Sequence, residues 1–187
     1  MRKLLKIMTF SFTAACLILF IAFLACNIKP IDLKTKAAEL KEYCVKNGYN
    51  TDYAILVDYS RFSLQKRLFV YDFNQEKVIL KTISGHGSGG DSTLLMADFS
   101  NVSGSHCSSL GHYKISRERK MYNRPCPAFE VDGLDKTNSN ARSRGILIHP
   151  SVGPLSWGCV TLPFCEYYKL SKLLHSLPQN VIMWVYE

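Results

Sequence analysis

The chain has 187 residues, of which 47% are hydrophobic, and carries a formal net charge of +8. This length and composition allow one folded domain with a short appendage and exclude a disordered tail. No Lys/Arg run is interleaved with aromatic residues, so the charge predicts no nucleic-acid partner and instead suits an anionic cell-wall or membrane surface.

Residues 1–25 have the layout of a secretory signal, because a start with three basic residues precedes a run without charge over residues 7–28. The small Ala25 before Cys26 also indicates lipoprotein processing, with a lipid on Cys26. The uncharged run is long enough to span a bilayer, which takes about 20 apolar residues. A cleaved signal peptide and an uncleaved membrane anchor therefore both stay open, and in either case the remainder of the chain is predicted to be exported.

The cysteine count beyond Cys26 is odd: Cys44, Cys107, Cys126, Cys159 and Cys165. Outside the cytosol an odd count leaves at least one thiol that no intrachain disulfide uses. The spacing matches no zinc-binding pattern, so no metal site is predicted. A disulfide between Cys107 and Cys126 stays open at this point.

A helix is predicted over residues 30–47, with apolar residues at steps of three and four along one face and a stop at Gly48. It lies in a linking segment, residues 26–50, that precedes the domain of residues 51–187. The domain begins with stretches rich in β-branched and aromatic residues, Tyr53–Tyr59, Arg67–Phe73 and Lys77–Ser84. The short link between the last two predicts a hairpin.

The next segment, residues 85–111, is rich in Gly and Ser and is predicted to be a long loop of functional importance. Further elements follow it: short strands at 112–116, 129–132 and 145–149, a helix from Pro163 to about His175, and a last strand at 180–186. The predicted fold class is mainly β, a β-rich α+β domain with a few packed helices.

Residues 145–163 carry the most chemical information. An apolar strand ends in His149, a turn follows, and Cys159 comes directly after Gly158 and before a second short strand at 160–162. Two adjacent strands joined by a turn place a His and a Cys at the same sheet edge, where the imidazole accepts the thiol proton. Gly158 leaves the sulfur uncovered, and backbone N–H groups from Trp157 to Cys159 are predicted to stabilise an oxyanion. The alternative is a buried structural Cys and His.

The motif Ser156-Trp157-Gly158-Cys159 after a strand-ending His resembles the catalytic motif of the murein L,D-transpeptidases, and the likeness to the L,D-transpeptidase catalytic domain-like family covers residues 53–187. Upstream elements resemble the family too: Ser84-Gly85-His86-Gly87, Phe99-Ser100-Asn101, Gly104-Ser105-His106, Ser108-Ser109-Leu110-Gly111, Asp132-Gly133-Leu134 and the segment from Asn138 to Arg144. The resemblance implies a β-sandwich or barrel with a few helices in the bacterial cell envelope, periplasmic or otherwise extracytoplasmic.

The resemblance also implies a mechanism without a cofactor. Cys159 attacks a peptidoglycan tetrapeptide stem to form a thioester, and His149 acts as base, oriented by the backbone carbonyl of the next residue, here Pro150. By the same resemblance His86 lines the substrate cleft. Arg142 and Arg144 are candidates for binding the stem-peptide carboxylates, because arginine binds a carboxylate bidentately, and Ser156 is a further substrate-binding candidate. His86 is alternatively a solvated loop residue, the two arginines alternatively form ion pairs within the fold, and Trp157 is either a cleft wall or a core residue.

Two departures from the family pattern leave the reaction open. Pro150 stands where the family usually has Gly, and only nine residues separate His149 from Cys159. Three functions are therefore kept: a transpeptidase that transfers the acyl group to an amine, a carboxypeptidase or endopeptidase of the same fold, and a wall-binding lipoprotein without catalysis.

Overall fold

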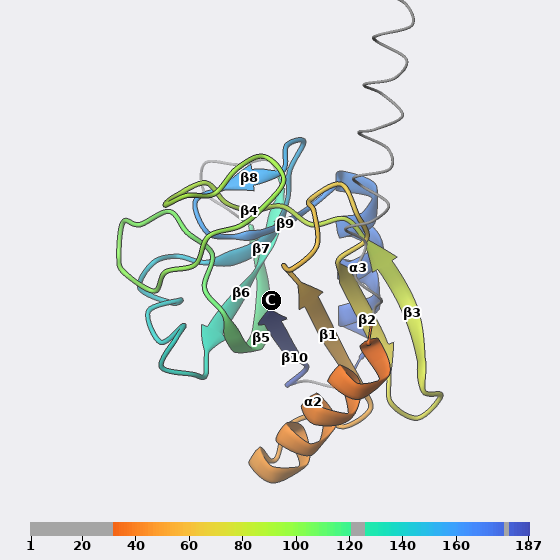
Figure 1. The fold of residues 1–187 in the computed structure, drawn as a ribbon. Helices are drawn as coiled ribbons and strands as arrows, with labels where there is room; N and C mark the ends of the chain where they lie inside the picture. Colours follow the sequence, from red (N-terminus) through yellow and green to blue (C-terminus); the bar gives the residue numbers. More distant parts are fainter. Residues whose placement is uncertain (1–31, 121–125, 178–179) are drawn as a thin grey trace, which may run out of the picture. The chain divides into compact units, whose positions relative to one another are not determined.

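A computed structural model describes residues 32–120, 126–177 and 180–187 of the chain (Figure 1). The predicted signal or anchor at residues 1–25 and the lipidation at Cys26 lie outside these residues. Within the described part of the chain, no helix is both long and apolar enough to cross a membrane.

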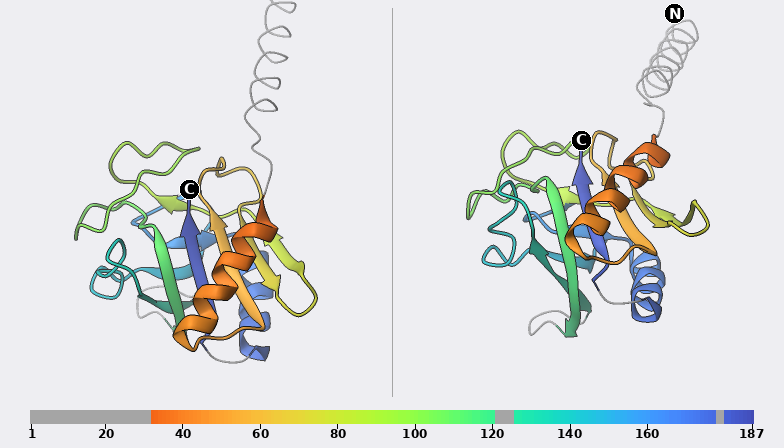
Figure 2. Two further views of the ribbon diagram at one scale, coloured as in Figure 1. Left: turned by 60° about the horizontal axis from the view of Figure 1, so that its bottom comes forward. Right: turned by 90° about the horizontal axis from the view of Figure 1, so that it is seen from below.

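Helix α2 spans Leu33–Asn47, and its ends have clear local causes. The side chain of Asp32 accepts a hydrogen bond from the N–H of Thr35 at 3.2 Å and caps the start, and Gly48 adopts a left-handed conformation with φ 69° at the end. The predicted stop at Gly48 is thus confirmed. The helix lies across one face of the sheet (Figure 2), and its buried residues are Ala37, Leu40 and Cys44.

Eight strands form one sheet in the order β3-β2-β1-β10-β5-β6-β7-β9. Their bounds are β1 Tyr53–Asp58, β2 Leu68–Asp72, β3 Lys77–Thr82, β5 Gly111–Lys120, β6 Pro127–Gly133, β7 Leu147–Pro150, β9 Val160–Leu162 and β10 Ile182–Tyr186. The predicted β2–β3 hairpin is confirmed. The last strand of the chain, β10, lies in the middle of the sheet, parallel to β1.

The two edge strands of the sheet approach each other. Gly85, three residues beyond β3, forms an antiparallel bridge with Thr161 of β9, and its N–H donates to the Thr161 carbonyl at 2.8 Å. The sheet is therefore a nearly closed barrel, and the predicted mainly β class with barrel character is confirmed. A second, two-stranded sheet pairs β4, His86–Gly87, in parallel with β8, Leu155–Ser156.

Alternating residues of β1 belong to two separate hydrophobic cores. Ile55 and Val57 lie in the barrel interior, and Ala54 and Leu56 pack under α2. Helix α3, Phe164–Ser176, begins directly after Pro163 as predicted and buries Tyr167 and Leu170 against the interior core. Cys165 of the same helix is exposed.

Strands β7 and β9 are neighbours, as the sequence predicts, but they run parallel. A tight turn joins only antiparallel strands, so a longer connection is needed here. It contains β8, which leaves the main sheet and pairs with β4 in the second sheet. In the observed register Ile148 lies opposite Val160 and His149 opposite Thr161. This register sets the relative position of the two predicted catalytic residues.

Candidate active site

One pocket of about 430 Å³ contains both residues that the sequence analysis singles out. Its lining is Ser88, Arg144, Gly145, Leu147, His149, Ser151, Leu155, Ser156, Trp157 and Cys159. Four of these are alternate residues along and around β7, whereas the residues between them, Ile146 and Ile148, belong to the interior core. The two-residue period of a strand therefore puts His149 on the outer, pocket-facing side of the barrel.

The imidazole of His149 is held by the residue that follows it. Nδ1 lies 2.9 Å from the carbonyl oxygen of Pro150. A carbonyl oxygen only accepts hydrogen bonds, so this contact assigns the proton of the neutral ring to Nδ1 and the lone pair to Nε2. The orienting carbonyl expected next to the His is present, because a proline in this position loses its N–H and keeps its C=O.

Cys159 directly precedes β9 and lines the same pocket. Because side chains alternate along an extended chain, Cys159 shares a face with Thr161, the residue opposite His149. Its Sγ lies 3.8 Å from the carbonyl oxygen of Gly145, at the start of the β7 segment. The thiol and the imidazole are thus brought to one pocket by two adjacent strands.

Gly158 is needed for its backbone conformation. Its φ is +103°, and a Cβ at this position would lie 2.6 Å from the carbonyl oxygen of Cys107. The N–H of Gly158, one of the predicted oxyanion donors, donates to Ser156 Oγ at 3.2 Å within this turn. The hydroxyl of Ser156 also contacts the carbonyl oxygens of Cys159 at 2.8 Å and His86 at 3.1 Å. Ser156 therefore closes the turn that presents the sulfur.

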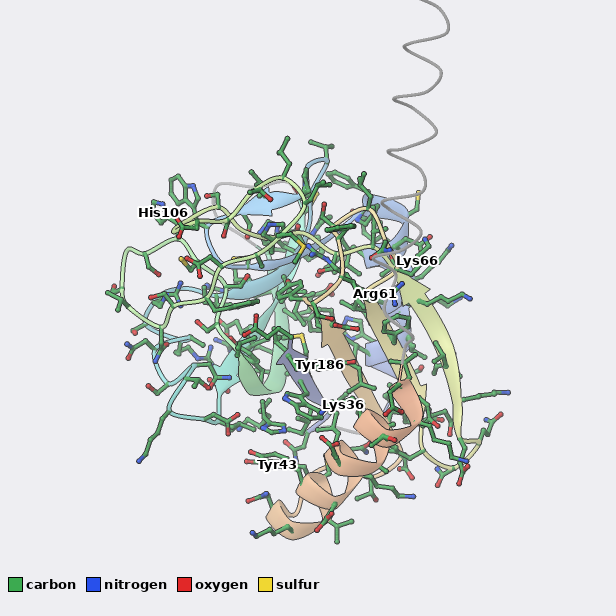
Figure 3. The ribbon with its side chains drawn as sticks, viewed as in Figure 1. Lys36, Tyr43, Arg61, Lys66, His106 and Tyr186 are labelled. Carbon is green, nitrogen blue, oxygen red and sulfur yellow. The ribbon has the colours of Figure 1, made fainter. Side chains whose placement is uncertain are left out.

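Trp157 forms a wall of the pocket. Its side chain is 74% exposed, and its ring stacks on that of His106 with centroids 4.8 Å apart and planes 8° apart. His106 lies on the long loop between β4 and β5 (Figure 3), so the stack joins that loop to the nucleophile turn. Of the two readings from sequence, cleft wall and core residue, the structure has the wall.

Arg144 lines the pocket, but its guanidinium N–H groups donate hydrogen bonds to other atoms of the protein. One terminal nitrogen donates to the carbonyl oxygen of Ser100 at 2.8 Å and to Ser109 Oγ at 2.6 Å, and the other donates to the carbonyl oxygen of Cys107 at 2.6 Å. Among the ion pairs of the described residues, none involves Arg144. It thus places a positive charge without a carboxylate partner beneath the nucleophile turn.

His86 matches neither expectation. It is fully buried, outside the pocket lining, where Nδ1 contacts a guanidinium nitrogen of Arg67 at 2.7 Å and Nε2 contacts the carbonyl oxygen of Thr93 at 2.9 Å. Burial lowers the pKa of His86, and the charge of Arg67 lowers it further. The neutral ring therefore accepts from Arg67 and donates to Thr93. It supports the segment that pairs with β8.

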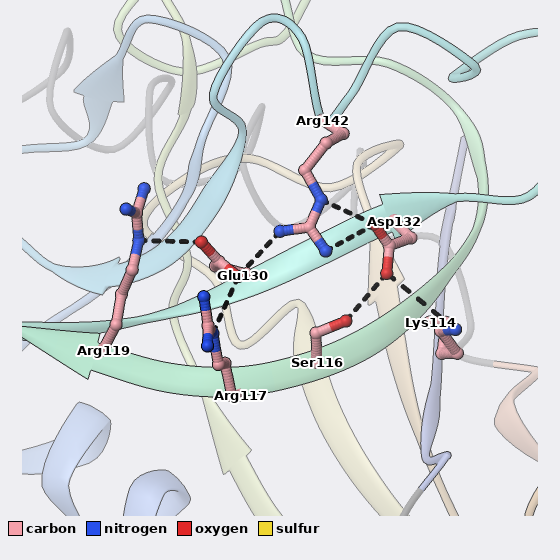
Figure 4. A network of polar contacts seen from close by, with 7 residues as sticks. All are labelled: Lys114, Ser116, Arg117, Arg119, Glu130, Asp132 and Arg142. Carbon is pink, nitrogen blue, oxygen red and sulfur yellow. Dashed lines mark hydrogen bonds and ion pairs between the residues drawn. The ribbon is translucent and has the colours of Figure 1, made fainter.

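Arg142 forms ion pairs within the fold, which is the alternative role left open by the sequence. It pairs with Glu130 at 2.7 Å and with Asp132 at 2.7 Å on the outer face of β6, and it does not line the pocket (Figure 4).

The disulfide between Cys107 and Cys126 that the sequence left open is not formed in this structure, because both residues are free thiols.

Five lining residues were not predicted from the sequence. Gly145, Leu147 and Ser151 lie at even intervals from His149, so the strand period alone would have found them. Ser88 and Leu155 reach the pocket through the β4–β8 pairing, for which the sequence carries no signal.

Comparison with known proteins agrees with this geometry. Residues 27–186 match the family model described as L,D-transpeptidase catalytic domain, and the chain therefore belongs to that family. No curated protein sequence matches it. The resemblance inferred from the Ser-x-Gly-Cys motif is thus confirmed at the level of the family.

Several solved structures are similar to the chain at low sequence identity. A point variant of the helical cell shape determining protein Pgp2 from Campylobacter jejuni is 18% identical, with a TM-score of 0.51 over 74% of this chain and 48% of that one. Bd1075 from Bdellovibrio bacteriovorus is 19% identical, with a TM-score of 0.48 over 75% and 49% of the two chains. An L,D-transpeptidase from Xylanimonas cellulosilytica is 12% identical, with a TM-score of 0.42 over 78% and 68%. The chain thus spans about half the length of the first two.

Proposed function

We propose that the chain is an exported peptidoglycan L,D-transpeptidase with Cys159 as nucleophile and His149 as general base. The observation that carries this proposal is that both side chains line one pocket while the Pro150 carbonyl fixes Nδ1 of the ring at 2.9 Å. That contact leaves Nε2 with the lone pair that a general base needs.

The proposed reaction has two halves. His149 takes the thiol proton, and the Cys159 sulfur bonds to the amide carbonyl carbon after the L-centre of the diamino acid in a tetrapeptide stem. The C–N bond to the terminal D-alanine breaks, and His149 returns the proton to the leaving amine. An amine of a neighbouring stem then attacks the thioester and gives a cross-link, and His149 passes the proton of that amine back to the sulfur.

Two groups assist the charge changes. Arg144, whose terminal nitrogen would lie 3.1 Å from a Cβ at position 158, favours the thiolate and the oxyanion through its positive charge. The backbone N–H of Trp157 is the proposed oxyanion donor, since the N–H of Gly158 already bonds to Ser156. Ser156 itself contributes by fixing this turn.

The location follows from the same proposal. A peptidoglycan substrate requires an extracytoplasmic domain. Residues 1–25 then act as a signal peptide or membrane anchor, with a lipid on Cys26 as the other means of attachment to the membrane.

The test is acylation of the full-length chain in detergent by a carbapenem, followed by intact-protein mass. We expect one covalent adduct, absent in Cys159→Ala and strongly slowed in His149→Asn. Cys165→Ser is the matched control, because that thiol is exposed and outside the pocket lining. A well-folded wild-type protein without an adduct would overturn the proposal and favour a wall-binding lipoprotein. Muropeptide analysis with a tetrapeptide substrate then separates transfer, which yields cross-links, from hydrolysis, which yields shortened stems.

A further inference from the structure

Next to the strand that carries His149 lies a charged surface that the proposed reaction does not use. In the antiparallel pairing of β6 with β7, Glu130 lies directly opposite Leu147, which lines the pocket. Residues directly opposite each other in antiparallel strands place their side chains on the same face. Glu130, and with it Asp132, therefore lies on the same outer face of the barrel as His149.

An irregularity in β5 widens this surface. Between Ile115 and Glu118 the register with β6 shifts, so that β5 has one residue more than β6. As a result both Ser116 and Arg117 reach the outer face of β6. Ser116 Oγ donates to Asp132 at 2.8 Å, and Arg117 Nε lies 3.5 Å from a carboxylate oxygen of Glu130 (Figure 4).

The charges of this surface do not cancel. Glu130 and Asp132 are surrounded by four cations, namely Lys114, Arg117, Arg119 and Arg142, which we call the arginine patch. Hydrogen bonding and charge from Arg142, together with the charges of the neighbouring arginines, lower the pKa of Glu130. Its carboxylate is therefore held by interactions within the patch. The carboxylates are mostly buried, whereas the side chains of Arg117 and Arg119 are 80% and 51% exposed. A surplus of positive charge thus faces solvent.

The spacing of the patch from the sulfur fits a peptide. From β9 to β5 there are three strand intervals, or roughly 14 Å at about 4.8 Å each. An extended peptide covers about 3.4 Å per residue, so roughly four residues join the two points. A stem peptide whose carbonyl lies at Cys159 is therefore long enough for its own carboxylates, or those of the attached wall, to reach the patch.

We propose that the arginine patch binds carboxylates of the peptidoglycan and holds the wall polymer while one stem peptide occupies the pocket. The inference rests on the proposed function and names the part of the substrate that this surface recognises. Arginine suits the role because its planar fork of donors matches a carboxylate, and Arg117 and Arg119 contact Glu130 through Nε while most of each side chain stays exposed.

The test is co-sedimentation of the full-length chain in detergent with insoluble peptidoglycan sacculi that have been stripped of other wall polymers. We expect Arg117→Gln/Arg119→Gln to weaken binding about tenfold at low salt, since two exposed contacts of this kind together correspond to about one decade in affinity. Arg117→Lys/Arg119→Lys keeps the charge without the planar fork, so it should restore part of the binding. Sacculi whose carboxyl groups have been amidated should bind the wild type as weakly as intact sacculi bind the Gln variant.

The matched control is Lys77→Gln/Lys81→Gln, which removes the same charge from exposed residues of β3 at the other edge of the sheet. It should bind like the wild type, and thermal unfolding checks that every variant is folded. Equal binding by the Arg→Gln variant, an equal loss in the Lys→Gln control, or undiminished binding to amidated sacculi would each overturn the patch. Co-sedimentation with anionic phospholipid vesicles is measured in parallel. If the Arg→Gln variant loses binding to the vesicles but not to the sacculi, the proposal is likewise overturned. Absence of a carbapenem adduct contradicts the proposed function instead, and sacculus binding is measured independently of it.

Discussion

Arg144 donates a hydrogen bond of 2.6 Å to the carbonyl oxygen of Cys107, and the same oxygen would lie 2.6 Å from a Cβ at position 158. This one carbonyl therefore ties the long loop to the β7 segment and determines which residue fits before the nucleophile. The pocket depends on this junction as much as on the two residues proposed to react.

Replacing Arg144 separates its structural and electrostatic roles. Arg144→Gln leaves partly buried carbonyl oxygens without their donor, so we expect a loss of about 2 kcal/mol in the free energy of unfolding and a carbapenem acylation rate at least tenfold lower. Arg144→Lys keeps the charge and loses the fork, so it should recover more of the rate than of the stability. Denaturant unfolding and stopped-flow acylation measure the two. Equal recovery of both by Lys would argue against a role for the charge.

Gly158→Ala should damage the turn that presents the sulfur. The positive φ disfavours any side chain, and the added Cβ meets backbone that cannot move aside, so we expect a destabilisation of about 1–3 kcal/mol together with loss of acylation. Gly153→Ala, in the same β7–β9 connection, is the control, because its Cβ meets nothing within 4 Å. Thermal unfolding of the two variants decides the matter, and similar melting temperatures would contradict this account of Gly158.

The tautomer of His149 is directly observable. The Pro150 contact predicts that the neutral ring carries its proton on Nδ1, which ¹⁵N NMR of the imidazole distinguishes from the Nε2–H form. Pro150→Gly keeps the carbonyl, so it should keep both the tautomer and an acylation rate within a few-fold of the wild type. A dominant Nε2–H form in the wild type near neutral pH would contradict the proposal that Nε2 of His149 acts as the base.

The buried His86 predicts how stability depends on pH. Its pKa is lowered from the ordinary value of 6.5, so just below that pH the unfolded chain binds a proton that the folded chain does not. The free energy of unfolding therefore falls as the pH drops through about 6.5, by up to about 1.4 kcal/mol per pH unit from this group. His86→Gln should reduce that slope in denaturant titrations between pH 5 and 7.5. A slope unaffected by His86→Gln would contradict the burial.

Much of the fold was predictable because its signals are local. The capped helix up to Gly48, the β2–β3 hairpin and the helix after Pro163 depend on residues a few positions apart, and all three are confirmed. The parallel course of β7 and β9 was not predictable, because the nine intervening residues resemble a turn until β8 pairs with β4. The place of β10 between β1 and β5 likewise depends on partners far away in the chain.

By itself the sequence determined the family and singled out the thiol and imidazole that we propose to react, since these depend on a short motif and on strand periodicity. Only the tertiary structure decided that His86 is buried rather than in the cleft, that Arg144 holds a loop, and that Arg142 joins Arg117 and Arg119 beside the pocket. The physical reason is that strand register and burial arise from pairing between distant segments. No local pattern of residues encodes which side chains those pairings bring together.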